Sequence, residues 1–156
     1  ARCAAFAQYL DLNPQQVETV TLTALVHDVG MRLLDYDRLY TKPNVSSDEI
    51  TLLREHVTIG AAMVEPILGH EIARAVLCHH ERVDGAGYPF QLRGDEIPLA
   101  SRILQICDVY VTMTDPTSYA RTETHEAAMG VIKRGAGGQF DKSLAEKFAE
   151  MMTAAS

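Results

Sequence analysis

The stretch that decides the fold is HHERVDGAGYP, residues 79–89, in which two adjacent histidines end a helical pattern and a glycine-rich segment follows. Upstream, Ile72 and Val76 lie one helical turn apart, so the histidine pair extends the same apolar helix face. Downstream, the four Gly and Pro residues between positions 81 and 97 predict a loop. Two imidazoles are therefore expected inside the protein, where a helix passes into a loop.

Three further predicted helices place a polar residue on an apolar stripe. His27 continues the stripe of Val20 and Ala24, His56 lies between Leu52 and Ile59, and Asp108 lies between Leu104 and Val111. With Asp28, which follows His27, these positions form a set of candidate metal ligands that should face the core: His27, Asp28, His56, His79, His80 and Asp108. By contrast, His70 and His125 lie among polar residues and are expected at the surface.

A buried polar group without a partner costs about 1–3 kcal/mol, and a buried ion costs more. Taken singly, His27 and His56 are more simply core residues, whereas the adjacent His79 and His80 fit a core role and a ligand role equally, and Asp108 slightly favours a ligand. Together they form either a polar network or a metal cluster, and the cluster is favoured because one group of cations satisfies all six. Imidazole and carboxylate ligands without thiolate suit Fe, Mn, Zn, Co or Ni better than a structural zinc site.

Six candidate ligands exceed what one tetrahedral ion needs, and the Asp28 carboxylate could bridge two ions. Two ions about 3.5–4 Å apart activate water and clamp a phosphoryl group. This is the chemistry of phosphoester hydrolysis, and it makes His27 and Asp28 the candidate catalytic pair.

Helix signals along the rest of the chain predict an all-α, single-domain bundle of about seven helices over residues 1–156. Asn13 and Pro14 should begin the second helix, which would end at a capping Gly30. Ser46 and Glu49 form a capping-box pattern that begins one long helix ending near Pro66. The other helices are expected over residues 2–10, 70–80, 98–114, 124–134 and 141–153, with an irregular segment over 31–45.

Composition narrows the classes of function. A net charge of −7 disfavours a protein that binds duplex nucleic acid, and no apolar run approaches the roughly 18 residues that span a bilayer. Three cysteines without metal-finger spacing are typical of reduced thiols and predict a cytoplasmic protein. The chain begins with Ala rather than Met, so we expect an N-terminally incomplete fragment that lacks an upstream regulatory domain.

These motifs resemble a known family. The segment HDVG at residues 27–30 is similar to the HD signature of metal-dependent phosphohydrolases, and residues 79–89 resemble the segment that defines the HD-GYP proteins. Segments 94–103, 107–110 and 138–141 continue the family pattern in order, so the resemblance covers essentially the whole chain.

The resemblance implies a metal-dependent phosphodiesterase that hydrolyses cyclic di-GMP to linear pGpG or GMP in bacterial second-messenger signalling. It implies the six candidates as ligands of two or three divalent ions, most often Fe or Mn, with Asp28 as the bridge. It also implies that the GYP loop can dock a diguanylate cyclase domain, and we expect a homodimer as one state of the protein. The implied substrate-binding residues are Arg82, Asp84, Gly85, Gly87, Tyr88, Pro89, Tyr119 and Arg121.

Two departures from the family pattern bear on activity. Met31 stands where the family usually has a lysine that touches the scissile phosphate, and Thr117 stands where an arginine usually follows. Removing one such donor can cost about 100- to 1000-fold in rate. We therefore expect slow hydrolysis, or alternatively a degenerate module that binds cyclic di-GMP or a partner protein without turnover. Hydrolysis of another phosphoester is a third hypothesis.

Overall fold

The computed structural model describes residues 2–34, 46–117 and 122–154, and within these ranges every named element is a helix. The elements are α1 Arg2–Tyr9, α2 Pro14–Val26, η1 Val29–Leu33, α4 Ser47–Arg54, α5 His56–Leu68, α6 His70–Leu77, η2 Gly94–Glu96, α7 Leu99–Thr114, α8 His125–Gly135 and α9 Lys142–Ala154. One residue alone separates α4 from α5, so these two α-helices occupy the place of one predicted helix. With that pair counted together, the all-α prediction of about seven helices is confirmed. The predicted irregular segment lies largely outside the described residues, at 35–45.

Two predicted helix starts are confirmed in atomic detail. The Asn13 side chain accepts a hydrogen bond from the Gln16 backbone at 2.9 Å, and the Gln16 side chain accepts one from the Asn13 backbone at 3.1 Å. Ser46 and Glu49 exchange the same pair of bonds at the start of α4. Each capping box satisfies two backbone donors that the first helical turn leaves without partners.

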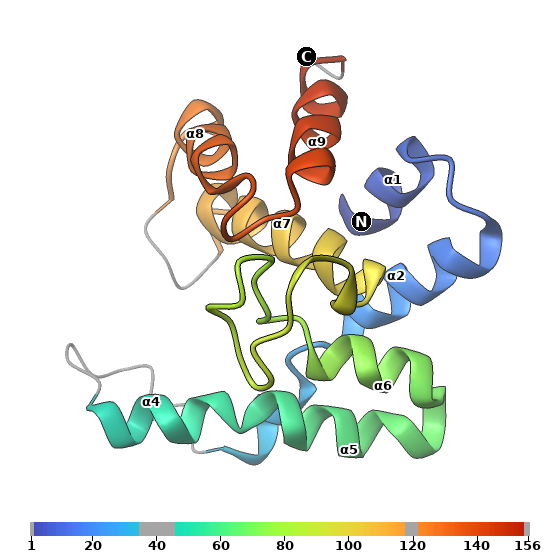
Figure 1. The fold of residues 1–156 in the computed structure, drawn as a ribbon, viewed down its shortest axis with the longest axis vertical. Helices are drawn as coiled ribbons and strands as arrows, with labels where there is room; N and C mark the ends of the chain where they lie inside the picture. The colour runs from blue at the N-terminus through green and yellow to red at the C-terminus, as the bar shows by residue number, and fades with distance from the viewer. Residues whose placement is uncertain (1, 35–45, 118–121, 155–156) are drawn as a thin grey trace.

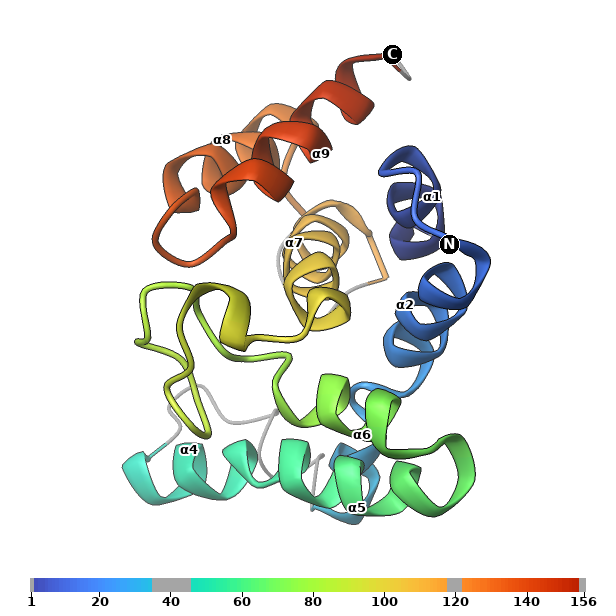
Figure 2. The same cartoon turned by 45° about the vertical axis from the view of Figure 1, so that its right-hand side comes forward.

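The helices pack around two hydrophobic clusters (Figures 1 and 2). The larger cluster joins α1, α2, α7, α8 and α9 with Ala75 of α6, and it includes the fully buried Phe6, Ile103 and Phe148. The smaller cluster lies between α5 and α6 and receives side chains from the end of α2. Both views show the loop between α6 and α7 in the space between these two parts of the molecule. The ends of α2 and α6, the start of α5 and the middle of α7 consequently meet where the two parts join.

The prediction of one uninterrupted helix after Ser46 is wrong. The helix breaks at Glu55, and α5 begins anew at His56 and continues past Pro66 to Leu68. The break leaves the Leu53 carbonyl able to accept a hydrogen bond from the His56 ring. Capping signals could not reveal this interruption, because the residues around Glu55 are all compatible with a helix.

The prediction that Gly30 caps α2 is also wrong. The helix ends at Val26, and Gly30 lies buried within η1. A Cβ at this position would lie 2.1 Å from the His56 carbonyl oxygen and 2.6 Å from the Gly60 nitrogen. Gly30 therefore allows η1 to pack backbone to backbone against α5, which brings Asp28 opposite His56. Among the described helices, none is long and apolar enough to cross a membrane.

Candidate metal centre

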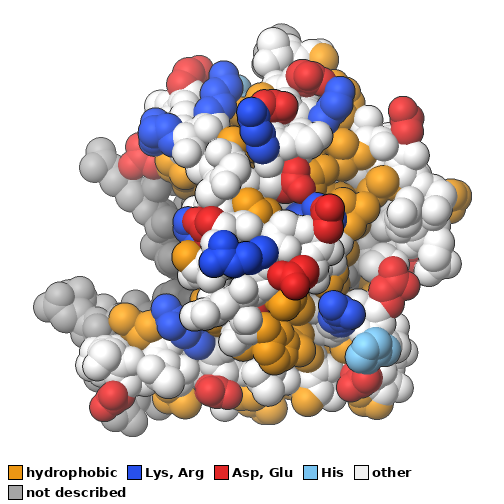
Figure 3. All heavy atoms as spheres, in the orientation of Figure 1, with side chains coloured by type: hydrophobic (Ala, Val, Ile, Leu, Met, Phe, Trp, Pro, Cys, Tyr) orange, Lys and Arg blue, Asp and Glu red, His pale blue; other side chains and the backbone are white. Residues whose placement is uncertain are grey.

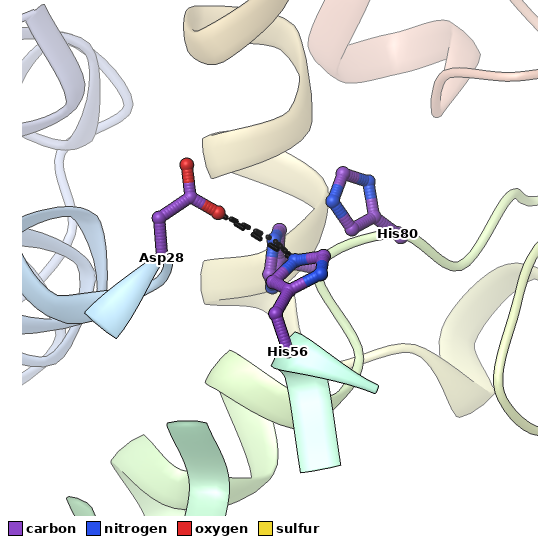
Figure 4. Close-up of side chains that lie close together, drawn as sticks. Asp28, His56 and His80 are labelled. Carbon is purple, nitrogen blue, oxygen red and sulfur yellow. Dashed lines mark hydrogen bonds and ion pairs between the residues drawn. The ribbon is translucent and has the colours of Figure 1, made fainter. Parts of the chain in front are cut away.

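The structure brings the six sequence-predicted ligands together from four places in the chain. Four of them, Asp28, His56, His79 and His80, each offer a ligand atom within 4.8 Å of the others (Figure 4). His27 and Asp108 extend the group on one side, with the His27 Nε2 atom 3.8 Å from an Asp108 oxygen. The six residues come from the chain after α2, the start of α5, the chain after α6 and the middle of α7.

Asp28 presents its two carboxylate oxygens to different neighbours. Oδ1 lies 3.5 Å from the Nε2 atom of His56 and 3.7 Å from that of His79. Oδ2 lies 3.3 Å from the Nε2 atom of His27. The candidate ligands are thus divided into two groups, with Asp28 shared between them.

Three of the imidazoles are oriented by backbone carbonyls. The Nδ1 atoms of His27, His56 and His79 lie 3.0, 2.6 and 2.6 Å from the carbonyl oxygens of Ala24, Leu53 and Val76, each three residues earlier. These carbonyls belong to the last turns of α2, α4 and α6, where helical carbonyls lack intrahelical partners. A carbonyl can only accept, so each Nδ1 carries a proton, and in a neutral ring the Nε2 lone pair faces the cluster.

The arrangement fits a cation. The Nε2 atoms of His56 and His79 lie 3.4 Å apart, and two lone pairs at that distance repel each other. Ligand atoms about 2.1 Å from one ion, at angles of 90–109°, lie about 3.0–3.4 Å apart. The carboxyl ends of three helices also converge here, and helix C-termini favour positive charge. The cluster can therefore hold a metal ion.

The sequence prediction that all six side chains are buried is only partly right. His56 and His79 are 3% exposed, but the side chains of Asp28 and Asp108 are 56% and 40% exposed. Helical periodicity indicates which face carries a residue. It does not reveal that this face opens into a pocket, where a carboxylate can point to solvent and to the histidines together.

Electrostatics in the absence of metal reinforce the pairing of His27 with Asp28. Burial lowers the pKa of His27, but its hydrogen bond with Asp28 and the charges of Asp28 and Asp108 outweigh that effect and raise the pKa to about 9. Burial likewise raises the pKa of Asp28, but its interactions with His27 and His79 outweigh that effect and hold the pKa far below its usual range. At neutral pH the metal-free site therefore contains an ion pair at this position.

The other perturbed groups in the cluster are pushed toward their neutral forms. Burial, with the neighbouring histidines, lowers the pKa of His80 to about 2. The pKa of His56 is lowered mainly by burial, and the pKa of Asp108 is raised mainly by burial. A neutral imidazole is the form that binds metal, so His56 and His80 are ready to act as ligands at neutral pH.

A pocket of about 720 Å³ opens over the cluster. It is lined by four of the candidate ligands, Asp28, His56, His80 and Asp108, and also by Met31 and Tyr88. The Tyr88 ring stacks on His80 with the ring centroids 4.9 Å apart and the planes at 20°. A ligand in this pocket would thus lie next to the candidate metal ligands and Tyr88 together.

The loop that carries Tyr88 is fixed from beneath by Glu81, which is 1% exposed. Its carboxylate accepts hydrogen bonds from the backbone of Phe90 at 2.6 Å and of Leu92 at 3.0 Å. A Cβ on the buried Gly87 would lie 2.5 Å from the Glu81 Cα, so glycine is needed where the loop crosses itself. These contacts hold the loop against the cluster.

The predicted substrate-binding residues divide into those on the pocket and those that build the loop. Tyr88 lines the pocket. Arg82 instead forms a bidentate salt bridge with Asp84, in which its Nε and Nη2 atoms donate to the two carboxylate oxygens at 3.1 and 2.6 Å. Asp84 also accepts a hydrogen bond from the Ala86 backbone, and Gly85 adopts a positive φ of 80° between them. Pro89 follows in a cis peptide bond. A contact of these residues with substrate stays a prediction, and Tyr119 and Arg121 lie outside the described residues.

Sequence reasoning missed three residues around the pocket. Arg32 and Arg54 line it, and Glu81 anchors the loop. Arg32 directly follows Met31, and Arg54 lies two positions before His56, so proximity to the motifs was the available signal. Thr117, by contrast, is exposed and bonds to Asp115, outside the residues that line the pocket.

Comparisons with known proteins agree with this geometry. A family model described as the HD domain matches residues 1–144. The chain is 36% identical over 154 residues to a cyclic di-GMP phosphodiesterase of Vibrio cholerae, covering 93% of this chain and 31% of that protein. It is 32% identical over 139 residues to a cyclic di-GMP phosphodiesterase response regulator of Xanthomonas campestris pv. campestris, covering 86% and 36%.

A solved structure shares the fold. An HDG"Y"P protein of Bdellovibrio bacteriovorus superposes with a TM-score of 0.75 over 97% of this chain and 50% of that chain, at 18% identity. The chain spans about a third of the length of the two curated relatives named above.

Proposed function

Because the chain belongs to the HD domain family and, within it, to the HD-GYP proteins, we propose that it is a metal-dependent phosphodiesterase that hydrolyses cyclic di-GMP. The products would be linear pGpG, GMP or both, and the role would be bacterial second-messenger signalling. The observation that carries the proposal is the convergence of Nε2 atoms from separate elements on the two oxygens of Asp28.

The division of ligands by Asp28 supports two ions rather than one. His56, His79 and Oδ1 of Asp28 would hold one ion, with His80 beside them. His27, Asp108 and Oδ2 of Asp28 would hold the second. Imidazole and carboxylate ligands suit Fe, Mn, Zn, Co or Ni, and the family resemblance favours Fe or Mn among these metals. Two bound divalent ions lower the pKa of water toward about 7 and neutralise charge on phosphoryl oxygens.

The chain's own groups supply orientation and binding. His27 and Asp28, the predicted catalytic pair, lie at the centre of the site with Nε2 of His27 3.3 Å from Oδ2 of Asp28, and the backbone carbonyls fix the ring planes. Tyr88 forms an aromatic wall next to His80, suited to hold the dinucleotide over the cluster. Met31 contributes no charge to the pocket, which agrees with the expectation of slow turnover.

Hydrolysis is tested by incubating the full chain with Fe(II) or Mn(II) and cyclic di-GMP, and separating the products by chromatography. We expect pGpG or GMP, formed at a rate that disappears in Asp28→Asn and His79→Ala variants. Cyclic GMP-AMP and a nucleoside monophosphate serve as competing substrates. Absence of product over many hours from protein with bound metal would contradict the proposal, and faster cleavage of another phosphoester would change the substrate.

Met31 on the pocket wall favours a second candidate function. A chain that lacks the usual lysine could bind cyclic di-GMP without cleaving it and act as a non-catalytic signalling module. Tight binding of the dinucleotide to metal-loaded protein without turnover would support this alternative.

The remaining partner predictions are a diguanylate cyclase domain and a second copy of the chain. The loop around Tyr88 also carries Phe90, which is 59% exposed and could contact a diguanylate cyclase domain. A homodimer stays a prediction from the sequence. The cytoplasmic location also stays a prediction, with which the three free, buried cysteines agree.

A further inference from the structure

The pocket over the cluster contains two cations that the metal centre does not use. Among the described residues that line it, the charged groups are Asp28, Asp108, Arg32 and Arg54. The two aspartates face the histidines, and neither arginine forms a salt bridge to a described residue. An anionic ligand would therefore meet positive charge on this wall of the pocket.

Arg54 is the better positioned of the two. Its Cζ atom lies 4.9 Å from the centroid of the Tyr88 ring, within the range of a cation–π contact. Tyr88 in turn stacks on His80. This contact holds an exposed side chain at the rim of the pocket, in the last turn of α4, so that less side-chain freedom is lost when a ligand binds. Figure 3 shows basic side chains above this end of α4, beside the hollow that faces the loop.

The position of Arg54 relative to the candidate metal ligands indicates which part of a ligand it would contact. The Tyr88 ring touches both His80 and Arg54, so the guanidinium lies beyond this ring from the candidate metal ligands. A cyclic dinucleotide has two phosphodiesters on opposite sides of its macrocycle. When one lies at the cluster, the other must lie elsewhere in the pocket.

We propose that Arg54, held over the Tyr88 ring, binds the second phosphate of the cyclic dinucleotide, which is not being cleaved. The assignment rests on the proposed function and deepens it. It gives the pocket a means to prefer a molecule with two phosphates over a simple diester. A contact remote from the reacting phosphorus stabilises bound substrate and transition state alike, so it lowers KM rather than raising kcat.

The test compares the wild-type chain with Arg54→Gln and with Arg74→Gln, an exposed arginine on α6 that does not line this pocket. The affinity of each metal-loaded protein is measured by calorimetry with a bis-phosphorothioate analogue of cyclic di-GMP that resists cleavage. Turnover is measured on cyclic di-GMP and on bis(p-nitrophenyl) phosphate, which has a single phosphate.

We expect Arg54→Gln to weaken the Kd for the analogue and to raise KM for cyclic di-GMP by about tenfold or more. The loss on the single-phosphate diester should be clearly smaller, and Arg74→Gln should match the wild type. An unchanged Kd, or equal losses on both substrates, would overturn the assignment while leaving the phosphodiesterase proposal intact.

The phosphodiesterase proposal can also fail while the phosphate contact of Arg54 is supported. If the wild type binds the analogue but cleaves neither substrate, hydrolysis is contradicted, and a weaker Kd for Arg54→Gln still supports the phosphate contact. If the metal-loaded wild type binds no cyclic dinucleotide, both proposals are overturned.

Discussion

The Nε2 atoms of His56 and His79 face each other at 3.4 Å, and the Nδ1 atom of each ring is bonded to a backbone carbonyl. Neither ring can rotate to relieve the opposed lone pairs without breaking its carbonyl bond. Their close approach therefore destabilises the metal-free fold locally, and a cation bound by both rings would replace this repulsion with attraction.

Metal should consequently stabilise the chain. At a free metal concentration 1000 times the Kd, binding adds about 4 kcal/mol to the free energy of unfolding. For a chain of this length that raises Tm by roughly 10 °C. Thermal unfolding with Mn(II) and then with excess chelator measures the difference. His79→Ala should abolish the shift, and a shift of equal size in that variant would count against these ligands.

Replacing Asp28 with Asn should affect metal binding far more than folding. The substitution removes the charge shared by both groups of ligands, so we expect metal affinity to fall by about 100-fold or more. The side chain is 56% exposed, so the metal-free Tm should move by only a few degrees. Elemental analysis after dialysis gives the metal content. Asp95→Asn, a 95% exposed carboxylate on η2, is the control that should retain metal.

Metal affinity should weaken as the pH falls below about 9. In the metal-free protein His27 has its pKa raised to about 9, and a ligand must lose its proton before it binds metal. Binding at pH 7 should therefore release a proton, measurable by calorimetry in buffers of different ionisation enthalpy. Metal uptake without proton release would remove His27 from the ligand set.

The same pKa shift has the opposite effect on the metal-free fold. The folded-state pKa of His27 is raised above its unfolded value near 6.5, so its stabilising contribution is full below pH 6.5 and is lost as the pH rises through about 9. Denaturant unfolding of wild type and His27→Gln should show a stability difference that shrinks across that interval.

Replacing Met31 with Lys should raise turnover. The side chain lines the pocket, and a cation there would help stabilise charge on the phosphoryl group, by up to about 100-fold in kcat. Leu33→Lys adds the same charge to η1 at a 67% exposed position that does not line the pocket. Equal gains in both variants would point to the general electrostatic field instead of a direct contact.

Replacing Gly30 with Ala should distort the site from its backbone. The added methyl group would meet the His56 carbonyl and the Gly60 nitrogen, neither of which can move without shifting α5. We expect a loss of about 2–3 kcal/mol in the free energy of unfolding, together with weaker metal binding. Gly130→Ala in α8, where the methyl group meets only the Arg134 guanidinium, should be neutral or stabilising by about 0.5–1 kcal/mol. Similar losses in the two variants would contradict the packing role of Gly30.

The sequence could predict features that depend on local spacing. Asn13 and Ser46 mark helix starts because capping boxes involve residues only three positions apart. The candidate ligands could be found because His56 and Asp108 interrupt apolar stripes at helical spacing. We could expect these six side chains to lie together because six separate buried polar groups without partners would cost too much free energy.

Features that depend on contacts between distant segments could not be predicted. In the sequence Gly30 has the pattern of a helix cap, and its packing role is visible only when α5 lies against it. The break at Glu55 is not marked by any helix-breaking residue nearby. The two oxygens of Asp28 could be assigned to neighbours only once the helices were packed. Nothing in the sequence distinguishes Arg54 from other surface arginines, and its candidate role is visible only from its contact with Tyr88.

The carbonyls that orient His27, His56 and His79 belong to the main chain, so the aim of these rings does not depend on which side chains surround them. Neighbouring positions can therefore drift widely in composition while the rings keep their direction. Insertion or deletion of one residue in the last turn of α2, α4 or α6 is different, because it would swing an imidazole by about 100° around the helix axis. Lineages of this domain should accordingly tolerate substitution near these turns and reject changes in their length.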